Sequence, residues 1–196
     1  ASHNPGGIDG DFGIKYATAT GGQCQPAESQ AIQEQTLSIR EYRISDCPDI
    51  DLSTVRTARC ENTEVEIIDP FADYIEMMEG IFDFAKLKEL LTSDFRFVFD
   101  AMNGVTGPYG KKIFEEILGA PAGSVINAVP LEDFGGLHPD PNLIYAKHLV
   151  DLMYSEAAPD FAAANDGDGD RNMILGSGFF VSPSDCLAIL TDNYKL

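Results

Sequence analysis

The stretch that decides the fold is FRFVFDAMNGVTGPYGKKIFEEILGAPAGSVINAVP, residues 95–130. Residues 95–102 form an apolar run typical of a buried strand, and residues 124–130 form a second run of this kind. Between them, residues 107–119 have helical spacing and end at Gly119, a residue type that favours the end of a helix. A strand, a helix and a second strand in this order predict a βαβ unit with parallel strands.

The same alternation continues toward the C-terminus. LIYAKHLVDLMYS (143–155) predicts a helix, and DFAAAND (160–166) predicts a strand that ends in a loop. NMILG and FFVSP flank the glycine-rich turn GSG (176–178), which predicts a hairpin. We therefore expect an α/β fold with a mixed, largely parallel sheet flanked by helices.

The first part of the chain carries fewer strand signals. The expected elements are a strand over 10–20, a helix over 27–42, an irregular polar segment over 44–63, a short strand over 64–69 and a long or broken amphipathic helix over 71–91. These strands are too few for a complete sheet. Residues 1–74 are therefore expected to be part of one α/β domain, and residues 75–187 to form another.

The overall charge limits the partners of this chain. Its 196 residues have a formal net charge of −19, which disfavours nucleic acid and anionic membranes as partners. An anionic substrate would need local cations or a metal ion. No apolar run approaches the ~18 residues of a membrane-spanning helix, and the four cysteines form no CxxC pair. We expect a cytoplasmic protein whose cysteines are reduced.

The strongest chemical signal is the acidic loop, DGDGDR (166–171). Three carboxylates, on Asp166, Asp168 and Asp170, repel one another unless a cation neutralises them. The intervening glycines allow the backbone to curl so that all three side chains can face one point. Ligands that are oxygen atoms alone favour a hard cation such as Mg²⁺. Arg171 would then bind a phosphate or sugar oxygen.

Three other kinds of acidic loop share part of this pattern. An EF-hand needs glycine at loop position 6 and glutamate at position 12, but these positions are Arg171 and Ser177. A phosphatase that phosphorylates its own aspartate usually has Thr or Val after its D-x-D motif, which Arg171 fits poorly. A solvated acidic turn without a cation is the remaining alternative.

The chain begins with a second reactive loop, ASHNPGG (1–7). It presents the hydroxyl of Ser2 and the ring of His3, followed by strong turn formers. A Mg²⁺ ion held by three carboxylates keeps an open position for a phosphate oxygen. A phosphate carried by Ser2 would complete that site, so Ser2 is a candidate nucleophile.

Several segments together resemble the phosphoglucomutase branch of the α-D-phosphohexomutase family. They are ASHNPGG with GDFGIK (10–15), DAMNGVTGPYGKKIF (100–114), PLEDFGGLHPDPNLIYA (130–146), DGDGDRNMILG (166–176) and FFVSPSD (179–185). The resemblance is weak across residues 24–63. It implies two phosphohexomutase-type domains, the first incomplete: residues 1–74 would carry the phosphoserine loop, 75–187 the metal-binding loop, and 188–196 would begin the connection to a third domain.

The resemblance implies interconversion of glucose 1-phosphate and glucose 6-phosphate through a glucose 1,6-bisphosphate intermediate. Phosphorylated Ser2 would transfer its phosphoryl group, and Mg²⁺ would be bound by Asp166, Asp168, Asp170 and a phosphoserine oxygen. Substrate binding would fall to Ser2, Lys15, Asp170 and Arg171. His3 and Lys15 are both candidates for the general base, and the sequence does not separate them. His138 and Lys147 are expected to be structural or surface residues.

The resemblance leaves alternatives open. A non-catalytic scaffold relative, or a mutase for mannose or N-acetylglucosamine phosphates, would share much of this pattern. Asn103 stands where the branch commonly has His, and Asn165 where a more apolar residue usually precedes the acidic loop. Family members have four domains, so this stretch alone is expected to be inactive. A monomer is expected.

Overall fold

The chain divides into two compact units. The computed structural model describes residues 3–11 and 13–194. Of these, residues 3–11 and 73–194 form one unit, here called the sheet unit, and residues 13–72 form the other, the hairpin unit. The division at 72/73 lies close to the expected boundary at 74/75. The assignment of residues 1–74 to a first family domain stays a prediction.

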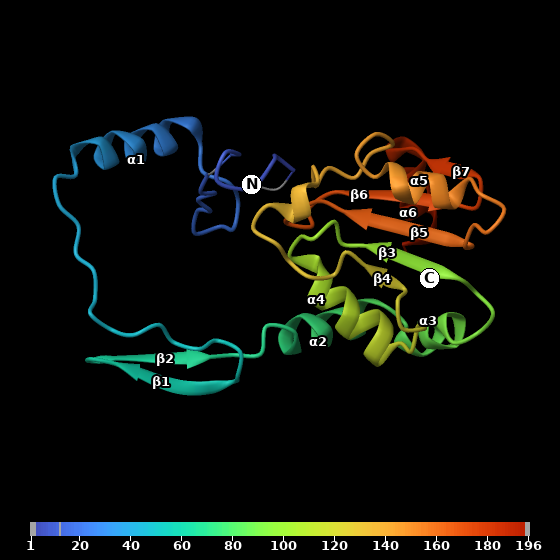
Figure 1. Cartoon of the computed structure of the whole chain (residues 1–196), viewed down its shortest axis with the longest axis horizontal. Coiled ribbons are helices and arrows are strands. Elements are labelled where there is room, and N and C mark those ends of the chain that lie inside the picture. Colours follow the sequence, from blue (N-terminus) through green and yellow to red (C-terminus); the bar gives the residue numbers. More distant parts are fainter. Residues whose placement is uncertain (1–2, 12, 195–196) are drawn as a thin grey trace. The chain divides into compact units, whose positions relative to one another are not determined.

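The sheet unit is built on five strands in the order β4-β3-β5-β6-β7 (Figure 1). Their bounds are β3 (Phe97–Asp100), β4 (Val125–Ile126), β5 (Phe161–Asn165), β6 (Asn172–Gly176) and β7 (Phe179–Val181). β3 runs parallel to β4 and β5, while β5–β6 and β6–β7 are antiparallel. The expected mixed sheet and the C-terminal hairpin are confirmed, with parallel strands in two of the four pairings.

Helices cover both faces of this sheet. The helical elements after residue 71 are α2 (Ala72–Ile81), α3 (Phe84–Leu91), α4 (Thr106–Gly110), the π-helix η1 (Lys111–Ile117), the 3₁₀ turn η2 (Phe134–Gly136), α5 (Lys147–Met153) and α6 (Pro183–Asn193). The helix expected over 71–91 is broken, because Asp83 caps a new helix by accepting a hydrogen bond from the Lys86 amide at 3.0 Å. The helix expected over 107–119 is α4 continued by η1.

Alternation along the strands separates two apolar layers. Phe97 and Phe99 of β3 pack on the face covered by α3 and η1, where Leu91 and Leu118 are buried. The opposite face of the sheet carries Ala162 and Ala164 of β5, packed against buried Leu149 and Met153 of α5. The sheet is thus the middle layer of an α/β/α arrangement, as side chains alternate between its faces.

The hairpin unit has little apolar core. It contains α1 (Pro26–Ser38), which buries none of its residues, and the antiparallel strands β1 (Arg56–Cys60) and β2 (Thr63–Ile67). The strand expected over 10–20 is wrong: the described part of that segment has only an isolated bridge between Ala17 and Gln23. Alternation alone does not create a strand where no partner strand is available. The expectation that residues 44–63 are irregular is wrong for the part of the segment that forms β1, because β1 pairs with β2.

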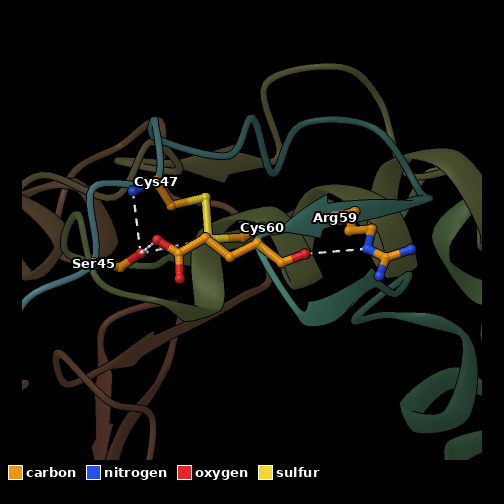
Figure 2. The surroundings of a disulfide bond; sticks show 5 residues. Ser45, Cys47, Arg59 and Cys60 are labelled. Carbon is orange, nitrogen blue, oxygen red and sulfur yellow. Dashed lines mark hydrogen bonds between the residues drawn. A yellow bond between two sulfur atoms is a disulfide. The ribbon is translucent and has the colours of Figure 1, made fainter.

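Two cysteines of this unit form a disulfide, which corrects the expectation of reduced cysteines. Cys47 and Cys60 are bonded, with their Cα atoms 5.7 Å apart. Figure 2 shows the bond beside Ser45, whose Oγ accepts a hydrogen bond from the Cys47 amide at 3.1 Å. Cys24 and Cys186 are not bonded in this way. The spacing of these residues gave no signal, because the pairing arises where the chain before β1 folds back onto the end of that strand.

No helix within the described residues has both the length and the apolar character that crossing a bilayer requires.

Counting alkylated thiols tests the disulfide. Under denaturing, non-reducing conditions the chain is expected to take up two alkyl groups, on Cys24 and Cys186, and four after reduction, since Cys47 and Cys60 are protected only while bonded. Intact mass spectrometry measures both numbers. The Cys47→Ser variant serves as the control, since it should show three labels with or without reduction. Four labels on the unreduced chain would refute the bond.

Candidate functional site

The candidate site lies where two parallel strands end. Asp100 is the last residue of β3, and Asp166 directly follows β5. The register pairs Phe97 with Phe161 and Asp100 with Ala164, so both strands end at the same edge of the sheet. Ligands of open α/β sheets bind at the carboxyl ends of strands. The acidic loop and the turn after β3 therefore meet where a ligand is expected.

The three predicted carboxylates converge. Oxygen atoms of Asp166, Asp168 and Asp170 lie within 4.8 Å of one another, and such a group could hold a metal ion. Asp166 is buried, whereas Asp168 and Asp170 are exposed. An all-oxygen set fits Mg²⁺ better than zinc, because Mg²⁺ prefers hard oxygen ligands and keeps part of its water shell. The donor chemistry thus fits the predicted ion.

The loop is closed by hydrogen bonds of its own. The Oδ1 atom of Asp166 accepts from the Arg171 amide at 3.0 Å, and its Oδ2 atom accepts from Nε of Arg171 at 3.1 Å. Gly169 has a φ of +79° and its amide donates to the Asp166 carbonyl at 3.1 Å. This left-handed conformation suits glycine. A Cβ at Gly169 would also lie 2.5 Å from Cγ2 of Thr106.

The charge on Asp166 is disfavoured in the absence of a cation. Burial raises the pKa of the Asp166 carboxyl above its usual value, and the neighbouring Asp170 raises it further, while hydrogen bonds from Arg171 act in the opposite direction. A divalent cation at this point would compensate both unfavourable effects. The electrostatics therefore agree with the geometry of a cation site.

Arg171 is surrounded by carboxylates. Besides Asp166, its guanidinium lies 3.4 Å from Oδ1 of Asp140 and 3.9 Å from Oδ1 of Asp170. Sequence reasoning missed Asp140. The sequence feature that could have pointed to Asp140 is the segment HPDPN (138–142), in which prolines on both sides of one acidic residue restrict the backbone. Asn165 has a role here too: its Nδ2 donates to the Arg171 carbonyl at 2.9 Å and so helps to close the loop.

The turn after β3 packs directly on the acidic loop. The Val105 amide donates to the Gly167 carbonyl at 3.0 Å. A Cβ at Gly104 would lie 2.7 Å from the same carbonyl oxygen, so the two backbones approach too closely for any other residue type. Beside them, a cavity of about 500 Å³ is lined by Tyr74, Tyr109 and Asp168, among others.

Residues 3–11, which include the described part of the N-terminal loop, belong to the same unit. Ser2 lies outside the described residues, so its role stays a prediction. The loop after it is a tight turn in which the Asp11 amide donates to the Pro5 carbonyl at 2.9 Å. A Cβ at Gly6 would lie 2.8 Å from the Glu132 carbonyl oxygen and 2.8 Å from the Phe134 ring. The segment 131–136, here called the platform, is thus in close contact with this loop.

The other predicted residues have varied settings. His3 is half-buried in the sheet unit, and Lys15 is an exposed residue of the hairpin unit. The choice between them as a base stays open. His138 stacks on Tyr145 with ring centroids 3.9 Å apart, and Lys147 forms an ion pair with Asp151 at 2.6 Å. These contacts agree with the structural and surface roles expected for His138 and Lys147.

Comparisons with known proteins give a consistent result. Residues 72–177 match the model of the family described as "Phosphoglucomutase/phosphomannomutase, alpha/beta/alpha domain II". The chain is 54% identical over 191 residues to a chloroplastic phosphoglucomutase of Solanum tuberosum, covering 97% of this chain and 30% of that protein. It is 50% identical over 204 residues to a cytoplasmic phosphoglucomutase of Populus tremula, with coverages of 98% and 35%.

A solved structure is similar as well. It is the open form of parafusin, a phosphoglucomutase described as an exocytosis-sensitive phosphoprotein of Paramecium. The TM-score is 0.88 at 45% identity, and the match covers 98% of this chain and 37% of that one. The chain thus spans about a third of the length of the relatives it matches.

The pKa of Asp166 predicts a pH effect on stability. Because this pKa is higher in the folded chain than in the unfolded chain, where an aspartate titrates near ~3.9, the folded chain binds more protons between the two values. Stability should then fall as the pH rises through that window. With a chelator present, the wild type is expected to lose stability relative to Asp166→Asn as the pH rises above the usual aspartate pKa of ~4.

Urea denaturation of both chains at several pH values measures this difference. The Asp151→Asn variant is the control, because that exposed aspartate of α5 lies outside the acidic loop. A difference between the wild type and Asp166→Asn that is constant with pH, or that changes in the opposite direction, would contradict the assignment.

Proposed function

Because the chain belongs to the phosphoglucomutase/phosphomannomutase family, we propose that it is part of a phosphoglucomutase that interconverts glucose 1-phosphate and glucose 6-phosphate. One observation carries this proposal: the three carboxylates of the acidic loop converge at the sheet edge, in the same unit as the loop that follows Ser2. The names of the relatives support the assignment to glucose phosphates.

The proposed cofactor is Mg²⁺, held by Asp166, Asp168, Asp170 and a phosphoserine oxygen. The raised pKa of Asp166 and the oxygen-only donor set support this assignment. When bound, the ion would neutralise negative charge on the phosphoryl group that is transferred. Glucose 1,6-bisphosphate is the proposed intermediate and activator.

The residues of the chain would divide the remaining work. In the forward step, the bond between phosphorus and Oγ of phosphorylated Ser2 breaks while a bond to a sugar hydroxyl oxygen forms. The hydroxyl proton passes to a base, for which His3 and Lys15 remain the candidates, and the departing Oγ of Ser2 takes up a proton to become a hydroxyl. The second step returns the other phosphate of the bisphosphate to Ser2. Positioning and charge neutralisation supply most of the catalysis in such transfers.

Arg171 is the proposed group for a substrate phosphate or sugar oxygen. A guanidinium has five N–H donors in a planar fork, and Arg171 directs Nε toward Asp166 and another nitrogen toward Asp140. These two carboxylates hold the side chain at the edge of the acidic loop. Its charge would thus be placed beside the proposed ion when an anionic substrate binds.

The proposed partners follow from charge and family. Membership of the family supports a hexose monophosphate as the substrate, whereas the net charge of −19 disfavours nucleic acid and anionic membranes as partners. The chain is expected to act as a monomer. Relatives are named both chloroplastic and cytoplasmic, and we propose a cytoplasmic location. Phosphomannomutase activity is the second candidate, because the matching family includes both activities in its name.

Intact mass spectrometry tests the proposed phosphoryl transfer. After incubation with glucose 1,6-bisphosphate and Mg²⁺, the chain is expected to gain one phosphoryl group, located on Ser2 by peptide mapping. Ser2→Ala should gain none, and Asp168→Ala should gain less because the charge on the transferring group is less well neutralised. Asp151→Ala is the matched control and should behave as the wild type. Equal labelling of Ser2→Ala and wild type would disprove the role of Ser2.

Titration calorimetry tests the proposed ion separately. Mg²⁺ is expected to bind the unphosphorylated chain, and replacing any one of the three carboxylates by its amide should weaken binding by ~10-fold or more, as expected when a ligand or its support is lost. Asp151→Asn should bind as the wild type does. Unchanged affinity in Asp166→Asn would show that the acidic loop is not the cation site.

A further inference from the structure

The carboxylate that ends β3 is fully buried and has three partners. Oδ1 of Asp100 accepts hydrogen bonds from the Met102 amide at 2.8 Å and from Nδ2 of Asn127 at 2.9 Å. Its Oδ2 lies 2.5 Å from Nε2 of His148, a half-exposed residue of α5. Burying a carboxylate is costly unless it is paired. None of the roles proposed above uses this group.

Two of the partners of Asp100, Met102 and Asn127, have a strained backbone conformation. Met102 and Asn103 follow one another with φ of +48° and +55°, and Asn127 has a φ of +47°. Residues other than glycine rarely adopt this conformation, so the surrounding structure has to stabilise it. A side chain that accepts from the amide two residues ahead stabilises such a turn. Asp100 thus stabilises the turn after β3 directly and the Asn127 segment through its amide.

This turn is a shared support for both halves of the candidate site. On one side, Gly104 and Val105 contact Gly167 of the acidic loop, as described above. On the other side, the Asn103 carbonyl accepts from the Leu131 amide at 3.0 Å. A Cβ at Gly135 would lie 3.2 Å from Oδ1 of Asn103. The platform that starts at Leu131 contacts the N-terminal loop.

We propose that Asp100 is a positioning residue: by holding the left-handed turn at Met102 and Asn103, it sets the place of the acidic loop and of the platform together. The proposal deepens the phosphoryl-transfer function and rests on it. Asp100 acts through backbone, because its carboxylate is occupied by Met102, Asn127 and His148.

The chemistry gives a reason for such a device. Phosphoryl transfer depends on the placement of the reacting groups, and small displacements reduce the rate strongly. The acidic loop and the N-terminal loop come from distant parts of the sequence. A common turn that is fixed by a buried charge keeps the two loops at fixed positions relative to each other, whereas separate supports would allow them to shift independently.

The test compares Asp100→Ala, Asp100→Asn and Leu118→Ala. Asp100→Ala removes the acceptor for the Met102 amide, whereas Asp100→Asn keeps a carbonyl oxygen that can accept both bonds at Oδ1. Leu118 is buried at the end of η1, on the other face of the sheet from the apolar cluster that contains Met102, so Leu118→Ala destabilises the same unit away from the turn. It is the control for a merely structural effect.

Two readouts are measured at a temperature where each variant is folded. The first is hydrogen exchange of the Val105 amide, which the bond to Gly167 protects. The second is the Mg²⁺ affinity from titration calorimetry. We expect Asp100→Ala to lose the protection at Val105 and to bind Mg²⁺ ~10-fold more weakly. Asp100→Asn should restore most of both, and Leu118→Ala should retain both.

The outcomes separate this proposal from the proposed function. If the wild type binds no Mg²⁺, the metal assignment fails, while exchange at Val105 still decides whether Asp100 positions the loop. Wild-type protection and affinity in folded Asp100→Ala would overturn the proposal, as would an equal loss in Leu118→Ala. If Asp100→Ala does not fold, the Asn127→Ala variant is tested instead, because it removes one hydrogen-bond donor to Asp100. A partial loss of Val105 protection and of Mg²⁺ affinity in Asn127→Ala supports the proposal. No loss of either overturns it.

Discussion

The parallel pairing of β3 with β5 is the constraint on which the rest of the site depends. It places the residue that ends one strand and the residue that follows the other at a single edge of the sheet. The strands are short, and the apolar layers on both faces hold them in register, because a slip by one residue would move every side chain to the opposite face. The acidic loop and the turn after β3 meet only in this register.

The same edge concentrates unfavourable electrostatics. In a chain with a net charge of −19, burying one more carboxylate beside another is electrostatically unfavourable. Asp166 is nevertheless buried, with Asp170 close by. Arg171 compensates part of this repulsion from the protein itself. The arrangement would be a defect in a purely structural loop, whereas in a cation site the repulsion becomes the source of affinity. With the proposed cation site, stability and function would therefore compete at these residues.

Sequence patterns predicted what depends on local spacing. The βαβ alternation, the hairpin around residues 176–178 and the convergence of the three aspartates follow from periodicity and from glycines between charged residues. Contacts between distant segments were not predictable in this way. Asp140 reaches Arg171 from a separate loop, and Cys47 meets Cys60 only because the chain folds back beside β1. Residues 10–20 show the opposite failure: alternation was present, but the described part of that segment forms only an isolated bridge.

Backbone strain links these observations. Among the described residues, five other than glycine have positive φ, and four of them, Met102, Asn103, Asn127 and Phe134, lie in the turns around the candidate site. Such conformations persist only where the surroundings determine them strongly, and they cluster at functional sites. Here the surroundings include the buried Asp100 carboxylate and the close approach of Gly104 to Gly167. Local propensity argues against these turns, so the energy that maintains them comes from tertiary contacts, which is why the sequence pattern could locate the acidic loop but not its support.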